Sequence, residues 1–141
     1  MLNKVITGIA QKLNQVFGDG YEIYIDSVQQ GLNEPCFLIT CLQGAQNQLV
    51  GNLYERKQPF DILYYHRSKD SASEINDVIS SMQMEMEYII AGGSMLRGTN
   101  ISYEVVDDVL HFFVNYDLRV RKEIIPDEYM GNLTQTERVK M

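Results

Sequence analysis

Apolar residues recur along the chain at two different periods, and the period separates helices from strands. Over Leu2–Phe17 the apolar side chains are spaced by three and four positions, and Gly18-Asp19-Gly20 follows them. This pattern predicts an amphipathic helix with a glycine stop. A second helix is predicted over 71–90, because Ser71 and Glu74 resemble a capping box and Gly92-Gly93 follows the last apolar position.

Alternation of apolar and polar residues at period two predicts strands with one buried face. The expected strands cover residues 21–26, 36–42, 53–66, 100–106 and 110–120. The run over 36–42 is densely apolar, which is typical of a central strand covered on both faces. Residues 43–52 are polar and predict either a long hairpin tip or a protruding loop.

The order of these elements, α-β-β-β-α-β-β, predicts an α+β fold. Its sheet is expected to be mostly antiparallel, with the two helices on one face. The length of 141 residues fits a single domain. Because the chain becomes polar after Lys122, we expect the domain to occupy residues 1–122 and an extended C-terminal arm to occupy 123–141.

The net charge of −7, with 19 acidic and 12 basic residues, restricts the possible partners. It argues against a duplex-DNA-binding module and against docking on anionic lipid. It is compatible with a protein past which DNA slides without sticking. The sequence has neither a signal-peptide pattern nor a stretch of about 20 apolar residues, so we expect a soluble cytoplasmic protein.

The candidate catalytic residues are Asp61, His66 and His111. The two histidines end one predicted strand and begin another, so a small enzyme or ligand-binding domain with these residues around a pocket is one alternative. However, no Cys or Ser lies in a strained, glycine-flanked turn beside them, as nucleophilic catalysis requires. The Gly92-Gly93 pair follows a helix, whereas a phosphate-binding loop precedes one. We therefore expect no enzyme activity, no cofactor and no metal.

Charged residues near the strand ends favour contacts with other chains. Arg119, Arg121 and Lys122 form a basic patch in an acidic protein. The patch is either a solvated strand end or half of a charge-complementary contact with a neighbouring subunit. Asp61 interrupts an apolar strand, and it could ligate a metal or pair with an arginine such as Arg97 or Arg119.

With its elements in this order, the chain resembles the tail-terminator (tail completion) proteins of long-tailed phages, prophages and phage-tail-like bacteriocins of Gram-positive bacteria. The likeness runs from the N-terminal helix to about Lys122. It rests on the opening helix and strand over 2–26, on Pro59-Phe60-Asp61-Ile62 followed by Tyr64, and on a final hairpin that ends in Arg119-Val120-Arg121.

The resemblance implies a structural virion protein that forms a six-membered ring on the head-proximal end of a tail tube. Such a ring would stop tube growth and offer a platform to the neck or sheath. Its partners would be copies of itself and the tube protein, with a sheath or neck protein as a further partner. DNA would only pass through the lumen, and no membrane would be involved. It would be assembled in the bacterial host cytoplasm and remain in the virion or tail-like particle. A head–tail joining adaptor is the structural alternative.

The resemblance also indicates which residues would make the contacts. The expected subunit contacts are Arg56, Lys57, Asp61, Arg119, Arg121 and Lys122. The expected contacts to the tube or sheath are Gln46, Asn47, Gln48, Leu49, Val50, Asn52 and Tyr129.

Overall fold

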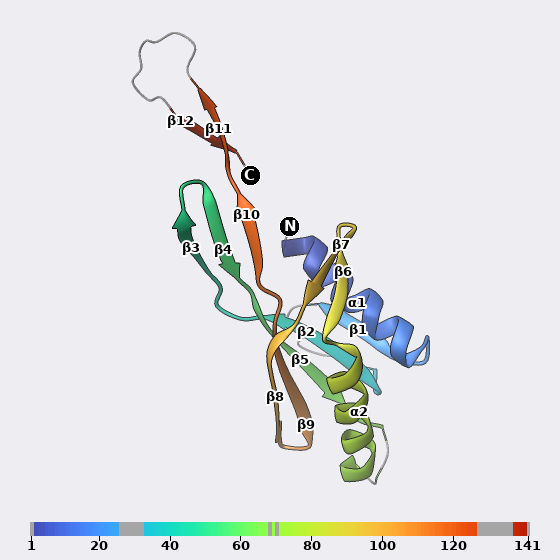
Figure 1. Cartoon of the computed structure of the whole chain (residues 1–141). Helices are drawn as coiled ribbons and strands as arrows, with labels where there is room; N and C mark the ends of the chain where they lie inside the picture. The colour runs from blue at the N-terminus through green and yellow to red at the C-terminus, as the bar shows by residue number, and fades with distance from the viewer. Residues whose placement is uncertain (1, 26–32, 68, 70, 127–136, 141) are drawn as a thin grey trace.

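The computed structural model describes residues 2–25, 33–67, 69, 71–126 and 137–140 (Figure 1). In chain order, its elements are α1 (Leu2–Phe17), β1 (Glu22–Ile25), β2 (Cys36–Cys41), β3 (Ala45–Val50), β4 (Leu53–Lys57), β5 (Pro59–Tyr65), α2 (Ser71–Glu85), β6 (Tyr88–Ala91), β7 (Ser94–Arg97), β8 (Thr99–Val106), β9 (Val109–Asn115), β10 (Leu118–Arg121), β11 (Glu123–Pro126) and β12 (Glu137–Lys140). Two helices combine with mostly antiparallel strands in a single domain, which confirms the predicted α+β class.

The body of the protein is a five-stranded sheet in the order β1-β2-β5-β9-β8. Strands β1 and β2 are parallel, and the other neighbours are antiparallel. Both helices lie on the same side of this sheet (Figure 1). Strand β2 is flanked on both edges and its first four residues are buried, as its apolar sequence predicted.

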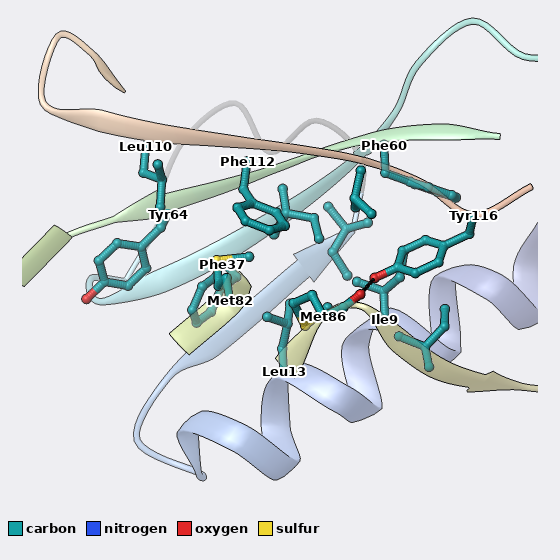
Figure 2. Packing of buried hydrophobic residues seen from close by; sticks show 14 of the residues in the cluster. Ile9, Leu13, Phe37, Phe60, Tyr64, Met82, Met86, Leu110, Phe112 and Tyr116 are labelled. Carbon is teal, nitrogen blue, oxygen red and sulfur yellow. Dashed lines mark hydrogen bonds between the residues drawn. The ribbon is translucent and has the colours of Figure 1, made fainter. Parts of the chain in front are cut away.

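The hydrophobic core lies between the helices and one face of this sheet (Figure 2). Its largest fully buried side chains are Tyr64, Tyr116, Phe37, Phe60, Phe112, Ile9, Leu13, Ile39, Ile62, Met82, Met86 and Ile89. On β5 and β9 the core residues are the even-numbered ones, because successive strand side chains point to opposite faces. The odd-numbered residues of both strands therefore face away from the helices.

The prediction that the second helix reaches residue 90 was wrong. Helix α2 ends at Glu85, and the following residues form the β6–β7 hairpin. Tyr, Ile and Ile at 88–90 favour strand conformation. Gly92 and Gly93 have φ angles of 60° and 83°, so they form the hairpin turn and do not cap the helix.

The two longest predicted strands, 53–66 and 110–120, are each divided in two. The first consists of β4 and β5 on either side of Gln58, and the second of β9 and β10 on either side of residues 116–117. The halves belong to different sheets: β5 and β9 to the body, and β4 and β10 to a three-stranded sheet in the order β10-β4-β3.

Residues 43–52 form a hairpin tip, one of the two forms predicted for them. Strand β3 pairs antiparallel with β4 across a turn in which Gly51 has a φ of 58°. Beyond β10, strands β11 and β12 pair antiparallel at the end of the chain (Figure 1). The boundary at 122 between domain and arm stays a prediction, and Tyr129 lies outside the described residues.

Candidate assembly interface

The sheet formed by β3, β4 and β10 extends from the body of the protein (Figure 1). It collects most of the residues that the sequence predicted as contacts. These are Gln46, Asn47, Gln48, Leu49 and Val50 on β3, Asn52 in the turn, Arg56 and Lys57 on β4, Arg119 and Arg121 on β10, and Lys122 directly after it. The two predicted groups, one for subunits and one for the tube or sheath, therefore share one sheet.

Several of these side chains form contacts between the strands of this sheet. The Asn52 side chain donates from Nδ2 to the carbonyl of Lys122 at 2.7 Å and accepts at Oδ1 from the Arg121 guanidinium at 2.9 Å. The Lys122 ammonium lies 4.1 Å from the centre of the Tyr54 ring, a cation–π contact. Arg56 donates from Nε to Gln46 Oε1 at 2.8 Å. These contacts hold β3 and β10 against β4.

The two faces of this sheet have different characters. Leu118 and Val120 pack against the hydrophobic core, so the even-numbered face of β10 points toward the body. The opposite face carries Lys57 on β4 and the exposed side chains of Arg119 and Arg121 on β10. Glu55 is directly opposite Arg119, yet within the described residues no ion pair joins them. This face therefore carries an excess of positive charge in an acidic protein.

Asp61 stands apart from this sheet, on the helix-free face of the body. It is 9% exposed, and its Oδ2 lies 2.8 Å from Nδ1 of His111 on the neighbouring strand β9. Its other oxygen, Oδ1, is buried and has no hydrogen-bond partner in the part of the chain that the structure describes. Burial raises the pKa of the Asp61 carboxyl above its ordinary value, and the bond to His111 opposes that shift.

The predicted trio of Asp61, His66 and His111 comes together only in part. Asp61 and His111 form a pair, whereas His66 follows the end of β5. His66 is five positions beyond Asp61 along an extended chain, which corresponds to roughly 16 Å. Within the described residues, no group of three or more His, Cys, Asp or Glu side chains could hold a metal ion. The Asp61–His111 pair thus links β5 to β9.

The sequence prediction missed two exposed apolar features. On the β6–β7 hairpin, Ile90 is 53% exposed and Met95 is 65% exposed. Strand β8 forms one edge of the body sheet and exposes Tyr103 and Val105. The sequence feature that could have indicated the β6–β7 hairpin is the Gly92-Gly93 pair, which is as typical of a hairpin turn as of a helix end.

Comparison with known proteins identifies the family. Neither helix in the described part of the chain is both long and apolar enough to span a membrane. No curated protein matches the sequence. The model of one protein family, described as phage tail terminator protein, matches residues 4–128. This match begins in the first turn of α1, includes the body and the β10-β4-β3 sheet, and ends beyond β11. The chain therefore belongs to the phage tail terminator protein family, whose members are structural proteins of the phage tail.

Proposed function

We propose that this protein forms a ring, six-membered by the family resemblance, that caps the head-proximal end of a phage tail tube. The observation that carries the proposal is the family match over residues 4–128, which includes both the body and the extending sheet. Membership places the chain in the tail, associated with the virion and in contact with other tail proteins. The ring and its position on the tube are the proposed steps.

The mechanism is steric. One face of the ring reproduces the contacts that a further tube ring would make, and the other face offers none of them, so growth stops. That second face then serves as a platform for a neck or sheath protein. A closed ring requires a heterologous contact, in which one patch of a subunit meets a different patch of the next. A sheet that extends from a compact body provides such a patch.

The predicted contact residues divide between the two kinds of contact. We assign Arg56, Lys57, Asp61, Arg119, Arg121 and Lys122 to the region between subunits. The tip of the β3–β4 hairpin, where Leu49 is 40% and Val50 is 77% exposed, is assigned to the tube or sheath together with the C-terminal arm. DNA only passes through the lumen, consistent with a net charge of −7, which disfavours binding to duplex DNA.

The experiment that tests this proposal is to measure tail-tube lengths in particles that lack the protein. A terminator stops polymerisation, so its loss should give overlong tubes of variable length, and wild-type protein supplied in trans should restore one length. Tubes of normal length without heads would contradict the proposal, because they are expected when a head–tail joining adaptor is missing. A variant with Leu49→Asp and Val50→Asp should fail to restore the length while remaining folded.

A further inference from the structure

Among the described residues, the sheet formed by β3, β4 and β10 has two unpaired edges on opposite sides. Its order is β10-β4-β3, so β4 is paired on both sides, whereas β3 and β10 each pair with one described strand only. Every residue of β3 is exposed. Unpaired edges carry backbone N–H and C=O groups that can extend a sheet into another chain.

The hydrogen bonds at the two ends of β10 establish which of its backbone groups face outward. The Tyr116 N–H donates to the Gln58 carbonyl at 3.0 Å, and the Lys122 N–H donates to the Asn52 carbonyl at 2.8 Å. In an antiparallel ladder, alternate residues point toward the same neighbour. The backbone groups of the odd-numbered residues Arg119 and Arg121 therefore point away from β4, toward the free edge.

The same alternation applies on the other side of β4. Because its even-numbered residues point toward β10, its odd-numbered residues point toward β3. Glu55 and Lys57 are opposite Asn47 and Ala45 in the β3–β4 ladder. Gln46 lies between those two β3 residues, so its backbone groups point outward to the free edge of β3. The register shift between β3 and β4 begins only after Gln48, so it does not affect this position.

We propose that β3 of one copy pairs with β10 of the next copy, so that the β10-β4-β3 sheets of all copies join into one continuous sheet around the ring. This inference rests on the proposed ring. Strands β3 and β10 both run antiparallel to β4 and therefore share one direction. A copy rotated about an axis along the strands keeps that direction, so the pairing between copies is parallel.

The register follows from the outward groups. In a parallel ladder, a residue whose backbone groups point toward the neighbouring strand bonds to two residues of that strand. These two residues flank the residue that lies directly opposite it. Asn47 of one copy then lies opposite Arg119 or Arg121 of the next, on the face that points away from the body.

The composition of β3 supports an edge that is covered in the assembly. Natural edge strands are commonly protected by lysine, by proline or by inward-pointing charge. Strand β3 has the sequence AQNQLV, with neither a charged residue nor a proline. The positive charges of the region lie instead on β4 and β10, where Lys57, Arg119 and Arg121 are exposed.

Disulfide cross-linking tests the pairing directly. In one chain, Asn47 and Arg119 are separated by two strand spacings, since both are opposite Glu55. That separation is about 10 Å, whereas a disulfide needs Cα atoms within about 7 Å. The double variants Asn47→Cys with Arg119→Cys, and Asn47→Cys with Arg121→Cys, can therefore form this bond only between copies. On oxidation of the rings, or of the protein bound to tail tubes, at least one variant should give a ladder of covalent oligomers.

The matched controls separate edge pairing from other contacts. Single-cysteine variants, which also contain Cys36 and Cys41, should give no ladder. The pair Gln48→Cys with Arg119→Cys should give none either, because those two side chains lie on opposite faces of the sheet.

A second test changes the backbone of β3 at Gln46. Gln46→Pro and Gln46→Ala both lose the hydrogen bond from Arg56, but only proline removes the outward N–H. We expect the alanine variant to assemble and the proline variant to remain monomeric with an unchanged circular dichroism spectrum.

The outcomes distinguish this inference from the proposed function. Rings or tube caps without a ladder, or a proline variant that assembles like the alanine variant, would overturn the edge pairing and leave the ring in place. Absence of rings and caps for the wild-type protein would overturn both.

Discussion

The Asp117 carboxylate accepts a hydrogen bond from the backbone N–H of Gln58 at 3.0 Å, at the point where two long strands divide. On the same pair of strands, the Tyr116 N–H donates to the Gln58 carbonyl. Gln58 separates β4 from β5, and Asp117 separates β9 from β10. One side chain therefore completes the junction between the body and the extending sheet.

We expect Asp117→Ala to destabilise the protein by about 1–2 kcal/mol, because it leaves the partly buried Gln58 N–H without its acceptor. Asp117→Asn keeps an oxygen acceptor at the same position and should cost clearly less. Urea unfolding of both variants measures the difference. Equal stabilities for the alanine and asparagine variants would show that the side-chain hydrogen bond does not stabilise this junction.

The buried Asp61 carboxyl should make stability depend on pH. Because its pKa is raised in the folded state, mainly by burial, the folded protein keeps this proton at pH values where the unfolded chain has lost it. The contribution of Asp61 is therefore fully present below its ordinary pKa of about 4 and is lost as the pH rises through the raised value. Because asparagine does not ionise, Asp61→Asn should remove this decrease in the unfolding free energy with rising pH.

Urea unfolding of wild-type protein and Asp61→Asn between pH 4 and about 5.5 tests this expectation, below the range in which histidines ordinarily titrate. The unfolding free energy of the variant minus that of the wild type should increase with pH. A difference that stays constant or decreases would mean that Asp61 does not titrate as its burial indicates.

Gly8 of α1 is packed closely against the β6–β7 hairpin. A β-carbon at this position would overlap the backbone carbonyl of Ile90. Although alanine favours helices by about 1 kcal/mol over glycine, we expect Gly8→Ala to lower the unfolding free energy by about 1–3 kcal/mol through overpacking. Gly20→Ala is the control, because no atom of the described residues lies within 4 Å of its added β-carbon. Thermal unfolding in which Gly8→Ala is at least as stable as Gly20→Ala would contradict this packing.

Tyr116 connects β9 to the segment between α2 and β6. Its buried hydroxyl donates to the Met86 carbonyl at 2.5 Å (Figure 2). Tyr116→Phe should cost about 1–3 kcal/mol of unfolding free energy, because it leaves a buried carbonyl without its donor. Tyr103→Phe, at an exposed edge position, should have little effect in the same chemical denaturation. A Tyr116→Phe variant as stable as Tyr103→Phe would rule out this contribution.

The sequence was sufficient for the fold class but not for every element. Periodicity located α1, the start of α2 and the main strands, because one-sided burial leaves a period in the residues. It could not distinguish a helix from a hairpin at 88–97, since Tyr-Ile-Ile followed by two glycines is compatible with both. Nor could it locate the breaks at Gln58 and Asp117, where a hydrogen bond joins residues far apart in the chain.

The candidate interface was predictable as a set of residues but not as a surface. The polar segment 43–52 and the arginines at 119 and 121 were identified separately and given different partners. Only the pairing of both β3 and β10 with β4 places them on one sheet. The direction in which backbone groups point at its edges has no signal in the sequence, because it is set by the phase of hydrogen bonding.

The most direct test of the central claim is negative-stain electron microscopy of the purified protein, alone and mixed with its tail tubes. We predict rings with a central hole, or caps on one end only of each tube, and tubes so capped should not grow when tube protein is added. Monomers that leave both tube ends bare and open to growth would contradict the assignment of this protein as a ring that ends the tail tube.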